Sequence, residues 1–401
     1  MDYPIVFIPG LFGSLGDDVI KGTGDFSFGF AERIYRPFIE ILNAMGYEED
    51  VDLFISYYDW KKPVLEAVDK YLFPYIEKIK EKTKRDRIIL IGHSLGGLLG
   101  RAYISYFSPS SVDKLIMIGT PNLGAVNAYY FWSGGKLPYS KIEDNILYNG
   151  LKLGFMLYYH LFKDINHIEA LRGIFPIVKD LLPSYGYGNY LFYEEAGIRK
   201  EISIGNMSMK NEFLNELDRK TIHPGKLYII GGKGVFTNKE YLVDIKNRGK
   251  IKWKDGKPIK AYRTNYGDGT VTTFSTLGHL GGENIVLEGN HTDILYRSKD
   301  YLSSILEKPI VSHVQEEKIE KAYIIFIEGC DKIDIRTSQI SEISSKDIDI
   351  IDDRIQAIKL GNNKFWILVT GDKDLEVELD AKPIGKVKPK IYKKIIDKKN
   401  I

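Results

Sequence analysis

Cysteine is almost absent from this chain of 401 residues. The single cysteine, Cys330, excludes an intramolecular disulfide and any zinc site built from several cysteines. Long apolar runs are absent too, so no segment reaches the length that a membrane-spanning helix needs. No leader-like segment precedes the strand-like run at 3–8. Such a start is typical of a cytoplasmic protein and equally of a mature secreted chain whose leader was removed.

An excess of charge of one sign is also missing. Lys and Arg number 56 against 54 Asp and Glu, which leaves a formal net charge of +2. Bulk charge therefore gives no reason to expect a nucleic-acid partner. The one local basic run, residues 386–400, is typical of a solvated tail.

The chain is instead rich in apolar and aromatic side chains. Apolar residues make up 44%, which is enough for the cores of two or three domains at this length. Aromatic residues make up 12%, including 27 tyrosines, and many of them fall between Tyr129 and Tyr193.

The first third of the sequence alternates short apolar runs with helical patterns. The predicted strands are 5–8, 53–55, 87–91 and 114–118, and the predicted helices are 31–45, 64–79 and 95–107. Strands that alternate with helices indicate an α/β fold, with a doubly wound, mostly parallel sheet covered by helices on both faces.

This rhythm stops after Gly124 and resumes near residue 226 with strands at 226–230 and 284–287 and a helix at 293–306. Short strands follow at 322–327, 333–335, 355–360, 364–370 and 375–379. We therefore expect a core in two parts, 1–124 and 226–309, an inserted and mainly helical cap at 125–225, and a β-rich, sandwich-like domain at 310–401.

The sharpest local motif is Gly92-His-Ser-Leu-Gly96, which lies between an apolar strand and a helix. This context is the one that a nucleophile elbow requires, because glycines permit a sharp turn that exposes the serine hydroxyl. The motif predicts Ser94 as a nucleophile. The alternative is a glycine-rich turn without chemistry.

A serine nucleophile needs a base and an acid that orients the base, and in such a fold they follow in the order Ser, Asp or Glu, His. Asp268 lies between two glycines in Tyr266-Gly-Asp-Gly-Thr-Val271 and is the candidate acid, although Asp-Gly alone is also a common turn. His291 follows a predicted strand in Glu288-Gly-Asn-His-Thr-Asp293, where a doubly wound sheet places its site. We predict His291 as the base, with His279 as the alternative.

Acyl transfer also requires donors for an oxyanion. The backbone N–H of Leu95, directly after the nucleophile, is one candidate. The loop Pro9-Gly-Leu-Phe-Gly-Ser14 follows the first strand, and we predict the Leu11 N–H as the second donor, with Phe12 as the alternative. A phosphate-binding loop is disfavoured, because Gly10, Gly13 and Gly16 lack its spacing and its lysine.

Seven segments together resemble the lecithin:cholesterol acyltransferase-like proteins of the α/β-hydrolase fold. They are residues 4–14, Tyr58-Asp-Trp-Lys61, Gly92-His-Ser-Leu-Gly-Gly97, Gly119-Thr-Pro-Asn-Leu-Gly124, Leu181-Leu-Pro-Ser184, Gly267-Asp-Gly-Thr-Val271 and Gly289-Asn-His-Thr-Asp293. The resemblance covers about residues 3–306. It departs from the family in Lys61, where arginine is usual, and in lacking the disulfides of the animal proteins.

The resemblance implies activity on lipid or other acyl esters, as an esterase, lipase or phospholipase, or as an acyltransferase. By motif it assigns Ser94, Asp268 and His291 as the triad and Leu11 with Leu95 as the oxyanion hole. We expect no cofactor, and no metal triad of His and Asp at useful spacing appears in the sequence. A zinc held by Asp59 and cap histidines is a minor alternative, and a non-catalytic lipid- or polymer-binding protein is a third possible function.

The aromatic residues of the cap have two possible roles. They line an acyl pocket or make transient contact with a lipid surface, or else they form the cap's own core. Phe12 and Trp60 are the candidate substrate contacts outside the cap, although Trp60 is more typical of packing than of chemistry. Oligomeric state and the role of 310–401 are not indicated by the sequence.

Overall fold

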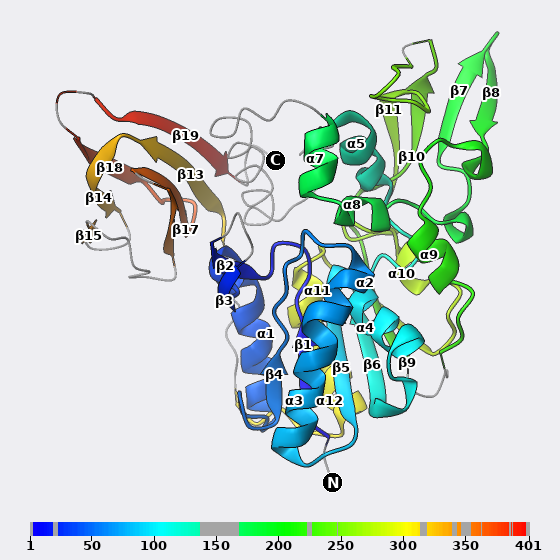
Figure 1. The fold of residues 1–401 in the computed structure, drawn as a ribbon, viewed down its shortest axis with the longest axis horizontal. Coiled ribbons are helices and arrows are strands. Elements are labelled where there is room, and N and C mark those ends of the chain that lie inside the picture. Colours follow the sequence, from blue (N-terminus) through cyan, green and yellow to red (C-terminus); the bar gives the residue numbers. More distant parts are fainter. Residues whose placement is uncertain are drawn as a thin grey trace.

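The structure, a computed structural model, describes residues 3–18, 23–136, 168–222, 227–246, 248–312, 319–338, 343–345, 354–361, 363–384, 386 and 388–397. Its centre is a six-stranded, wholly parallel sheet with the strand order β12-β9-β6-β5-β1-β4 (Figure 1). The strands are β1 (Ile5–Ile8), β4 (Leu53–Ile55), β5 (Ile88–His93), β6 (Val112–Ile118), β9 (Leu227–Lys233) and β12 (Glu283–Glu288). The α/β fold with a parallel sheet is therefore confirmed.

Helices cover the sheet in two groups whose members contact one another. One group comprises α1 (Glu32–Ala44), α11 (Asp293–Arg297) and α12 (Lys299–Leu306). The other comprises α2 (Val64–Ala67), a π-helical turn at Val68–Leu72, α3 (Phe73–Thr83) and α4 (Leu95–Tyr106). Every residue of β1 and β5 is buried, as expected for parallel strands covered on both faces. Within the described segments, no helix combines the length and the apolar character needed to cross a membrane.

The order of the strands places a topological switch beside β1. The chain proceeds from β1 to its neighbour β4 on one side and then to β5 on the other side. The loops that leave β1 and β5 therefore diverge, and a crevice at such a point is where open α/β sheets bind ligands. Ser94 and residues 9–14 lie on these two loops.

The segment between β6 and β9 carries helices and two strands. Its described elements are α5 (Val126–Gly134), α7 (Ile168–Ile174), α8 (Ile177–Asp180), β7 (Leu191–Glu195), β8 (Ile198–Ile202) and α9 (Glu212–Leu217). Strands β7 and β8 join β10 (Thr237–Asp244) and β11 (Lys257–Thr264), which follow β9, in a four-stranded sheet (Figure 1). The sequence analysis did not predict this sheet. Because β10 and β11 come from beyond residue 225, two separate chain segments build the region above the central sheet.

Several of the described aromatic residues of this insert belong to a second core, separate from that of the central sheet. Tyr129 and Tyr190 are fully buried and pack edge to face, with ring centroids 5.9 Å apart. Trp253, from the loop after β10, packs beside Tyr129 in the same hydrophobic cluster. These side chains therefore take the second of the two roles that the sequence left open. The remaining aromatics at 155–162 lie outside the described residues.

Two of the motifs quoted for the resemblance hold the insert to the core. Ser184 donates its N–H to the carbonyl of Leu123 at 2.9 Å, and Ala125 donates to the carbonyl of Leu181 at 2.8 Å. A Cβ on Gly124 would lie 2.2 Å from the Leu182 carbonyl oxygen, so only glycine permits this approach. The segments 119–124 and 181–184 thus act as one structural joint.

Asp180, at the end of α8, makes a second attachment. Its Oδ2 accepts the Val64 N–H, at the first turn of α2, at 2.8 Å. Burial raises the pKa of this carboxyl to about 6, and the Val64 hydrogen bond and Lys179 only partly offset that effect. Because the native pKa lies above the unfolded value, this group makes the protein less stable as pH rises from about 4 to about 6.

Replacing Asp180 by asparagine is expected to stabilise the protein at pH 8 by about 2 kcal/mol, since a shift of two pKa units sets an upper value near 3 kcal/mol. The amide oxygen still accepts the Val64 N–H, and the buried charge is gone. At pH 4, where the native carboxyl is already protonated, we expect little gain. Urea unfolding of both proteins at pH 4 and pH 8 measures this, and an equal gain at both values would contradict the buried-charge explanation.

The C-terminal region forms two packed antiparallel sheets. One has the order β16-β17-β13-β19 and the other β15-β14-β18. The strands are β13 (Lys321–Glu328), β14 (Cys330–Thr337), β15 (Ile343–Ser345), β16 (Ile355–Gly361), β17 (Lys364–Gly371), β18 (Val377–Pro383) and β19 (Lys390–Asp397), and a separate two-stranded hairpin, β2 (Leu15–Asp18) with β3 (Thr23–Ser27), precedes α1. Ile325 and Ile335, from the two sheets, share one hydrophobic cluster, so the predicted sandwich is confirmed.

The sandwich packs on the α/β core through aromatic side chains. Phe30, next to α1, meets Trp366 of β17 edge to face with ring centroids 4.5 Å apart, and both are buried. Gln356 donates to the carbonyl of Gly29 at 3.0 Å. The prediction that the basic run 386–400 is a solvated tail is wrong for residues 390–397. They form β19, because all eight of these residues pair with β13.

Candidate active site

Ser94 stands on a sharp turn between β5 and α4. Its backbone has φ 52° and ψ −121°, a conformation that non-glycine residues rarely adopt. The turn is possible because the helix behind it approaches the sheet closely. A Cβ on Gly96 would lie 2.1 Å from the Ile8 carbonyl oxygen, and one on Gly97 would lie 1.9 Å from Thr120 Oγ1. These glycines are therefore needed for the packing of α4 against the ends of β1 and β6.

Three predicted site residues form one hydrogen-bonded chain. His291 Nε2 lies 2.9 Å from Ser94 Oγ, and His291 Nδ1 lies 2.8 Å from Asp268 Oδ2. The three side chains come from the loops after β5, after β11 and after β12, up to 197 positions apart in sequence. All three residues are buried, with exposed fractions of 7% for Ser94, 1% for Asp268 and 2% for His291.

The second oxygen of Asp268 is fixed by backbone donors. Oδ1 accepts the N–H of Thr270 at 2.9 Å and the N–H of Val271 at 2.7 Å. Two donors on Oδ1 leave Oδ2 to accept the hydrogen bond of His291 Nδ1, and in that tautomer His291 Nε2 is the acceptor that faces the Ser94 hydroxyl. A Cβ on Gly232 would lie 2.6 Å from Asp268 Cβ, which shows how closely this loop lies against the end of β9.

A buried network that the sequence analysis missed joins the histidine loop to the loop after β1. His93 Nε2 lies 2.8 Å from the carbonyl oxygen of His291, so this ring nitrogen is the donor. His93 Nδ1 then accepts from the Tyr35 hydroxyl at 3.0 Å, and the Tyr35 oxygen accepts the Gly10 N–H at 2.9 Å. Burial lowers the pKa of His93 well below its usual value, in agreement with a neutral ring.

No sequence signal could have found this network. Tyr35 lies on α1, 58 residues before His93, and its helical pattern resembles that of any core position. His93 was expected to point away from the nucleophile, and it does. Its contact with the loop of His291 depends on how β12 lies beside the other strands.

The loop after β1 lies directly against Ser94. A turn closed by the Gly13 N–H and the Gly10 carbonyl, 3.0 Å apart, places Leu11 and Phe12 at its two corners, and Phe12 has φ 65°. A Cβ on Gly10 would lie 2.9 Å from Ser94 Cβ. Leu95 begins α4, and the first N–H groups of a helix have no acceptor within it. Both predicted oxyanion donors thus lie on segments that adjoin Ser94.

Phe12 and Trp60, the predicted substrate contacts, pack against each other. Their ring centroids are 4.7 Å apart, and Trp60 also stacks on Phe175 of the insert at 5.7 Å. Both Phe12 and Trp60 are buried. Tyr58 donates its hydroxyl proton to the Pro9 carbonyl at 2.8 Å and so braces the same loop. Residues 58–61 therefore support the loop after β1 and connect it to the insert.

The other candidate residues lie apart from the hydrogen-bonded chain. His279 is exposed, and its Nε2 lies 3.3 Å from the Gly186 carbonyl. Asp59 pairs with Lys61, with 3.6 Å between the carboxylate oxygen and Nζ. Among the described side chains, no three of the His, Cys, Asp and Glu type are grouped as a metal site would need. Residues His160, His167, His223 and His313 lie outside the described part.

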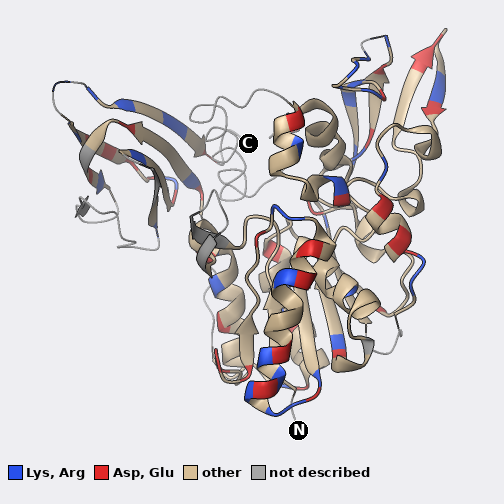
Figure 2. Cartoon of the chain, viewed as in Figure 1, with Lys and Arg blue, Asp and Glu red and all other residues tan. Residues whose placement is uncertain are grey.

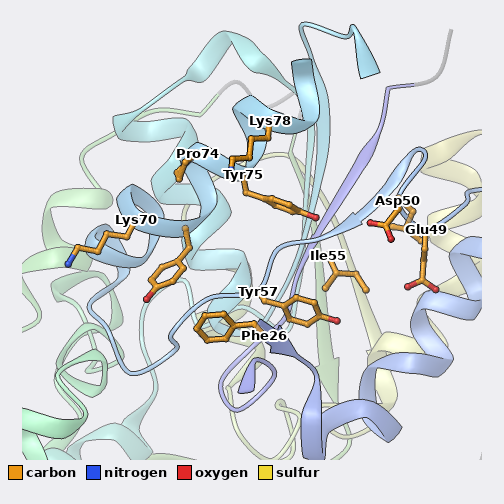
Figure 3. A pocket seen from close by; sticks show the side chains of 11 residues that line it. Phe26, Glu49, Asp50, Ile55, Tyr57, Lys70, Pro74, Tyr75 and Lys78 are labelled. Carbon is orange, nitrogen blue, oxygen red and sulfur yellow. The ribbon is translucent and has the colours of Figure 1, made fainter. Parts of the chain in front are cut away.

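A separate cavity of about 420 Å³ opens beside β4 at the edge of the sheet (Figure 3). Phe26, Tyr57 and Tyr75 line it, and Glu49 and Asp50 lie at one end. The whole lining is Phe26, Glu49, Asp50, Leu53, Ile55, Tyr57, Lys70, Tyr71, Pro74, Tyr75 and Lys78. It includes none of the residues of the Ser94 site.

Residues 27–149 match the family model described as lecithin:cholesterol acyltransferase. The chain is 26% identical over 125 residues to a triacylglycerol lipase of Pseudarthrobacter phenanthrenivorans, which covers 31% of this chain and 34% of that protein. It is 30% identical over 260 residues to UvrABC system protein B of Kosmotoga olearia, covering 62% of this chain and 35% of that protein. The chain thus spans about a third of the length of these curated relatives.

Among solved structures, the chain is similar to the mature form of the Bacillus licheniformis lipase BlEst2. The TM-score is 0.36 at 16% identity, over 76% of this chain and 92% of that one.

Proposed function

Because the chain is a lecithin:cholesterol acyltransferase-like α/β-hydrolase, we propose that it cleaves carboxylic esters of the lipid type through an acyl-enzyme on Ser94. The observation that supports this most is the chain of two hydrogen bonds, one between Ser94 Oγ and His291 Nε2 and one between His291 Nδ1 and Asp268 Oδ2. Such a chain supports the proposal, because a base takes the serine proton through a hydrogen bond and an acid orients the base through another.

In the first half-reaction, Ser94 Oγ attacks the ester carbonyl carbon while its proton passes to His291 Nε2. The carbonyl oxygen becomes an oxyanion, and the N–H groups of Leu95 and Leu11 are the proposed donors that stabilise it. When the tetrahedral intermediate collapses, the bond to the alcohol oxygen breaks and His291 returns the proton to the leaving alcohol. The acyl group stays on Ser94.

In the second half-reaction, His291 takes a proton from water, and the resulting hydroxide oxygen attacks the acyl carbon. The bond to Ser94 Oγ breaks, Ser94 recovers its proton, and the carboxylic acid leaves. Asp268 keeps its charge throughout and stabilises the imidazolium that forms in each step, since its Oδ1 stays bound to two backbone N–H groups.

We assign Tyr35 and His93 as positioning residues for this reaction. Their hydrogen bonds run from the Gly10 N–H, beside Leu11, to the carbonyl of His291. The donor loop and the base are therefore held at a fixed separation by one buried network.

Replacing Tyr35 by phenylalanine is expected to lower kcat by about tenfold and to leave KM nearly unchanged, because the donor loop loses its tie to the base but keeps its packing. The matched control is Tyr103→Phe, which removes another buried tyrosine hydroxyl on α4, where it lies 3.0 Å from Ser111 Oγ. Steady-state kinetics on a soluble ester measure both variants. Equal kcat losses in the two variants would show that the Tyr35 hydroxyl contributes only to the stability of the fold and does not position the donor loop.

Acyl transfer to an alcohol is the second candidate function, and the family-model match is what favours it. The two reactions share the acyl-enzyme and differ only in the acceptor. Incubation with a radiolabelled phospholipid, with and without a sterol or a long-chain alcohol, separates them by product analysis. We expect free fatty acid in both mixtures, whereas a predominance of the transferred ester would favour the acyltransferase. No product in either would favour the third possibility, a binding protein without catalysis.

A further inference from the structure

The last strand of the sandwich combines positive charge with exposed apolar side chains. Between residues 382 and 397 the sequence has six lysines and one acidic residue, Asp397. Four of the thirteen large hydrophobic residues found exposed in the described chain lie in the same stretch. They are Ile384, Ile391, Tyr392 and Ile395, with exposed fractions between 39% and 46%. The whole protein has a net charge of only +2, so this concentration is local.

The exposure follows from the place of β19 in its sheet. Within the part of the chain that the structure describes, the strand pairs with β13 on one side and with no strand on the other, since it is the last in the order β16-β17-β13-β19. Ile391 and Ile395 lie on the side of Ile327 and Tyr323, which face the interior of the sandwich. The exposed fraction of both, 46%, shows that the three-stranded sheet leaves this edge uncovered.

Two of the lysines lie on the opposite face of β19 from these isoleucines: Lys390 and Lys394 share the face of Tyr392, since side chains alternate along a strand. Lys390 and Lys394 are exposed on β19, and Lys388 is exposed just before it. Lys393 has a structural role instead, because its Nζ donates to the Val377 carbonyl at 2.9 Å. In Figure 2 the lysines form repeated blue bands along this strand, which in Figure 1 runs along the upper edge of the sandwich.

We propose that β19, together with residues 382–384, 386 and 388, forms a docking surface for an anionic lipid bilayer, and we call these residues the basic edge. Lysine ammonium groups attract anionic head groups, and the isoleucine and tyrosine side chains between them enter the interface. The inference rests on the proposed function in one respect, since an enzyme for lipid esters must reach its substrate at such a surface. Exposed apolar residues are not needed by a surface that binds only a soluble polyanion, which is why a bilayer fits better.

Lysines on an edge strand have a simpler use. They discourage edge-to-edge pairing with a second copy, as edge strands of soluble proteins commonly do. That use requires neither Ile391 nor Ile395 to be exposed, and it predicts no affinity for lipid. The two accounts therefore differ in a measurable way.

The test is co-sedimentation of the full chain with lipid vesicles, and the chain carries Ser94→Ala to prevent lipid turnover. One set of vesicles contains phosphatidylcholine alone, and the other also contains roughly 30–40 mol% phosphatidylserine. We expect binding to the anionic vesicles, weak binding to the neutral ones, and loss of binding at high salt. The triple variant Lys388→Gln, Lys390→Gln, Lys394→Gln should bind about 100-fold more weakly. The matched control, Lys78→Gln, Lys82→Gln, Lys84→Gln, removes the same charge at the end of α3 and should bind normally.

Several results would overturn the proposal. The chain that carries Ser94→Ala alone would fail to bind anionic vesicles, or the two triple variants would lose vesicle binding equally. Binding to an anionic polysaccharide without binding to vesicles would contradict the proposal as well. Increased self-association of the β19 variant with unchanged vesicle binding would assign the lysines to edge protection alone. Hydrolysis of a soluble short-chain ester by the β19 variant, on the Ser94 background, is measured separately. Failure of that hydrolysis in the unsubstituted chain would contradict the proposed function and leave the docking result standing.

Discussion

Replacing Ser94 by alanine is expected to lower kcat for ester hydrolysis by up to about 10⁶-fold, with the fold and the unfolding midpoint nearly unchanged. The reason is that no other group lies where Ser94 Oγ lies, 2.9 Å from the base. The alanine variant retains His291, Asp268 and the proposed oxyanion donors, so the remaining rate reflects water attacking a bound ester. Steady-state kinetics on a p-nitrophenyl ester, with circular dichroism as a check on folding, measure the loss.

The matched control is Ser56→Ala. Ser56 is also buried and also follows the carboxyl end of a strand of the central sheet, β4. We expect its kcat to stay within about twofold of the parent, since uncoupled substitutions away from a site have small effects. An Ser94→Ala variant that keeps most of its ester hydrolysis would show that the nucleophile is elsewhere.

Replacing Asp268 by asparagine is expected to lower kcat by about 10⁴-fold. The backbone N–H groups of Thr270 and Val271 bind Oδ1, so the asparagine carbonyl takes that position and its NH₂ group faces His291 Nδ1. Two donors then face each other unless the imidazole takes its other tautomer, with the proton on Nε2. In that tautomer Nε2 has no lone pair to accept the serine proton.

Asp255→Asn is the control for this substitution. Asp255 is a buried aspartate in the insert region, where it accepts hydrogen bonds from Ser208 N and Oγ at 2.7 and 2.8 Å. Its asparagine variant tests the loss of a buried carboxylate without touching the site, and we expect near-normal kcat for the molecules that fold. If Asp268→Asn stayed within tenfold of the parent rate, another acidic group would have to orient the base.

The central sheet could be predicted from the sequence because its strands are short apolar runs between helical patterns. Parallel strands that are buried on both faces have this apolar sequence pattern. The predicted helix at 293–306 is in fact two helices, α11 and α12, that meet at Ser298. The Ser298 hydroxyl donates to the Leu295 carbonyl at 2.7 Å, and such bonds bend or interrupt helices.

The four-stranded sheet above the core could not be predicted in the same way. Strand β8 is almost wholly exposed, β7 changes from buried Leu191 and Phe192 to exposed Glu194 and Glu195, and β10 pairs with β11 through register shifts. Their stability comes from the cluster of Tyr129, Tyr190 and Trp253, which joins segments more than 100 residues apart. The sequence predicts a solvated tail at the end of the chain, because β19 has lysines where a buried strand has apolar residues. The strand forms only because it pairs with β13.

Some residues of the candidate site could be predicted from sequence motifs, whereas others are recognised only from tertiary contacts. Ser94, Asp268 and His291 each lie in a glycine-flanked loop after a strand, a local pattern that a sequence can display. Tyr35 lies in an amphipathic helix without any such pattern, and only its hydroxyl, between the Gly10 N–H and His93 Nδ1, reveals its place. The domain boundaries at 124, 225 and 309, and the roles of Leu11, Leu95, Phe12 and Trp60 with substrate, remain proposals.

The most direct measurement is covalent labelling with a fluorophosphonate, followed by mass spectrometry of the digested protein. An activated serine displaces fluoride and forms a stable bond from its oxygen to phosphorus. We expect stoichiometric modification of the peptide that contains Ser94, and labelling at least about 100-fold slower in His291→Ala, because the base no longer removes the hydroxyl proton. Failure to label the chain, or labelling of a different residue at the same rate in both proteins, would contradict the assignment of Ser94 as the nucleophile.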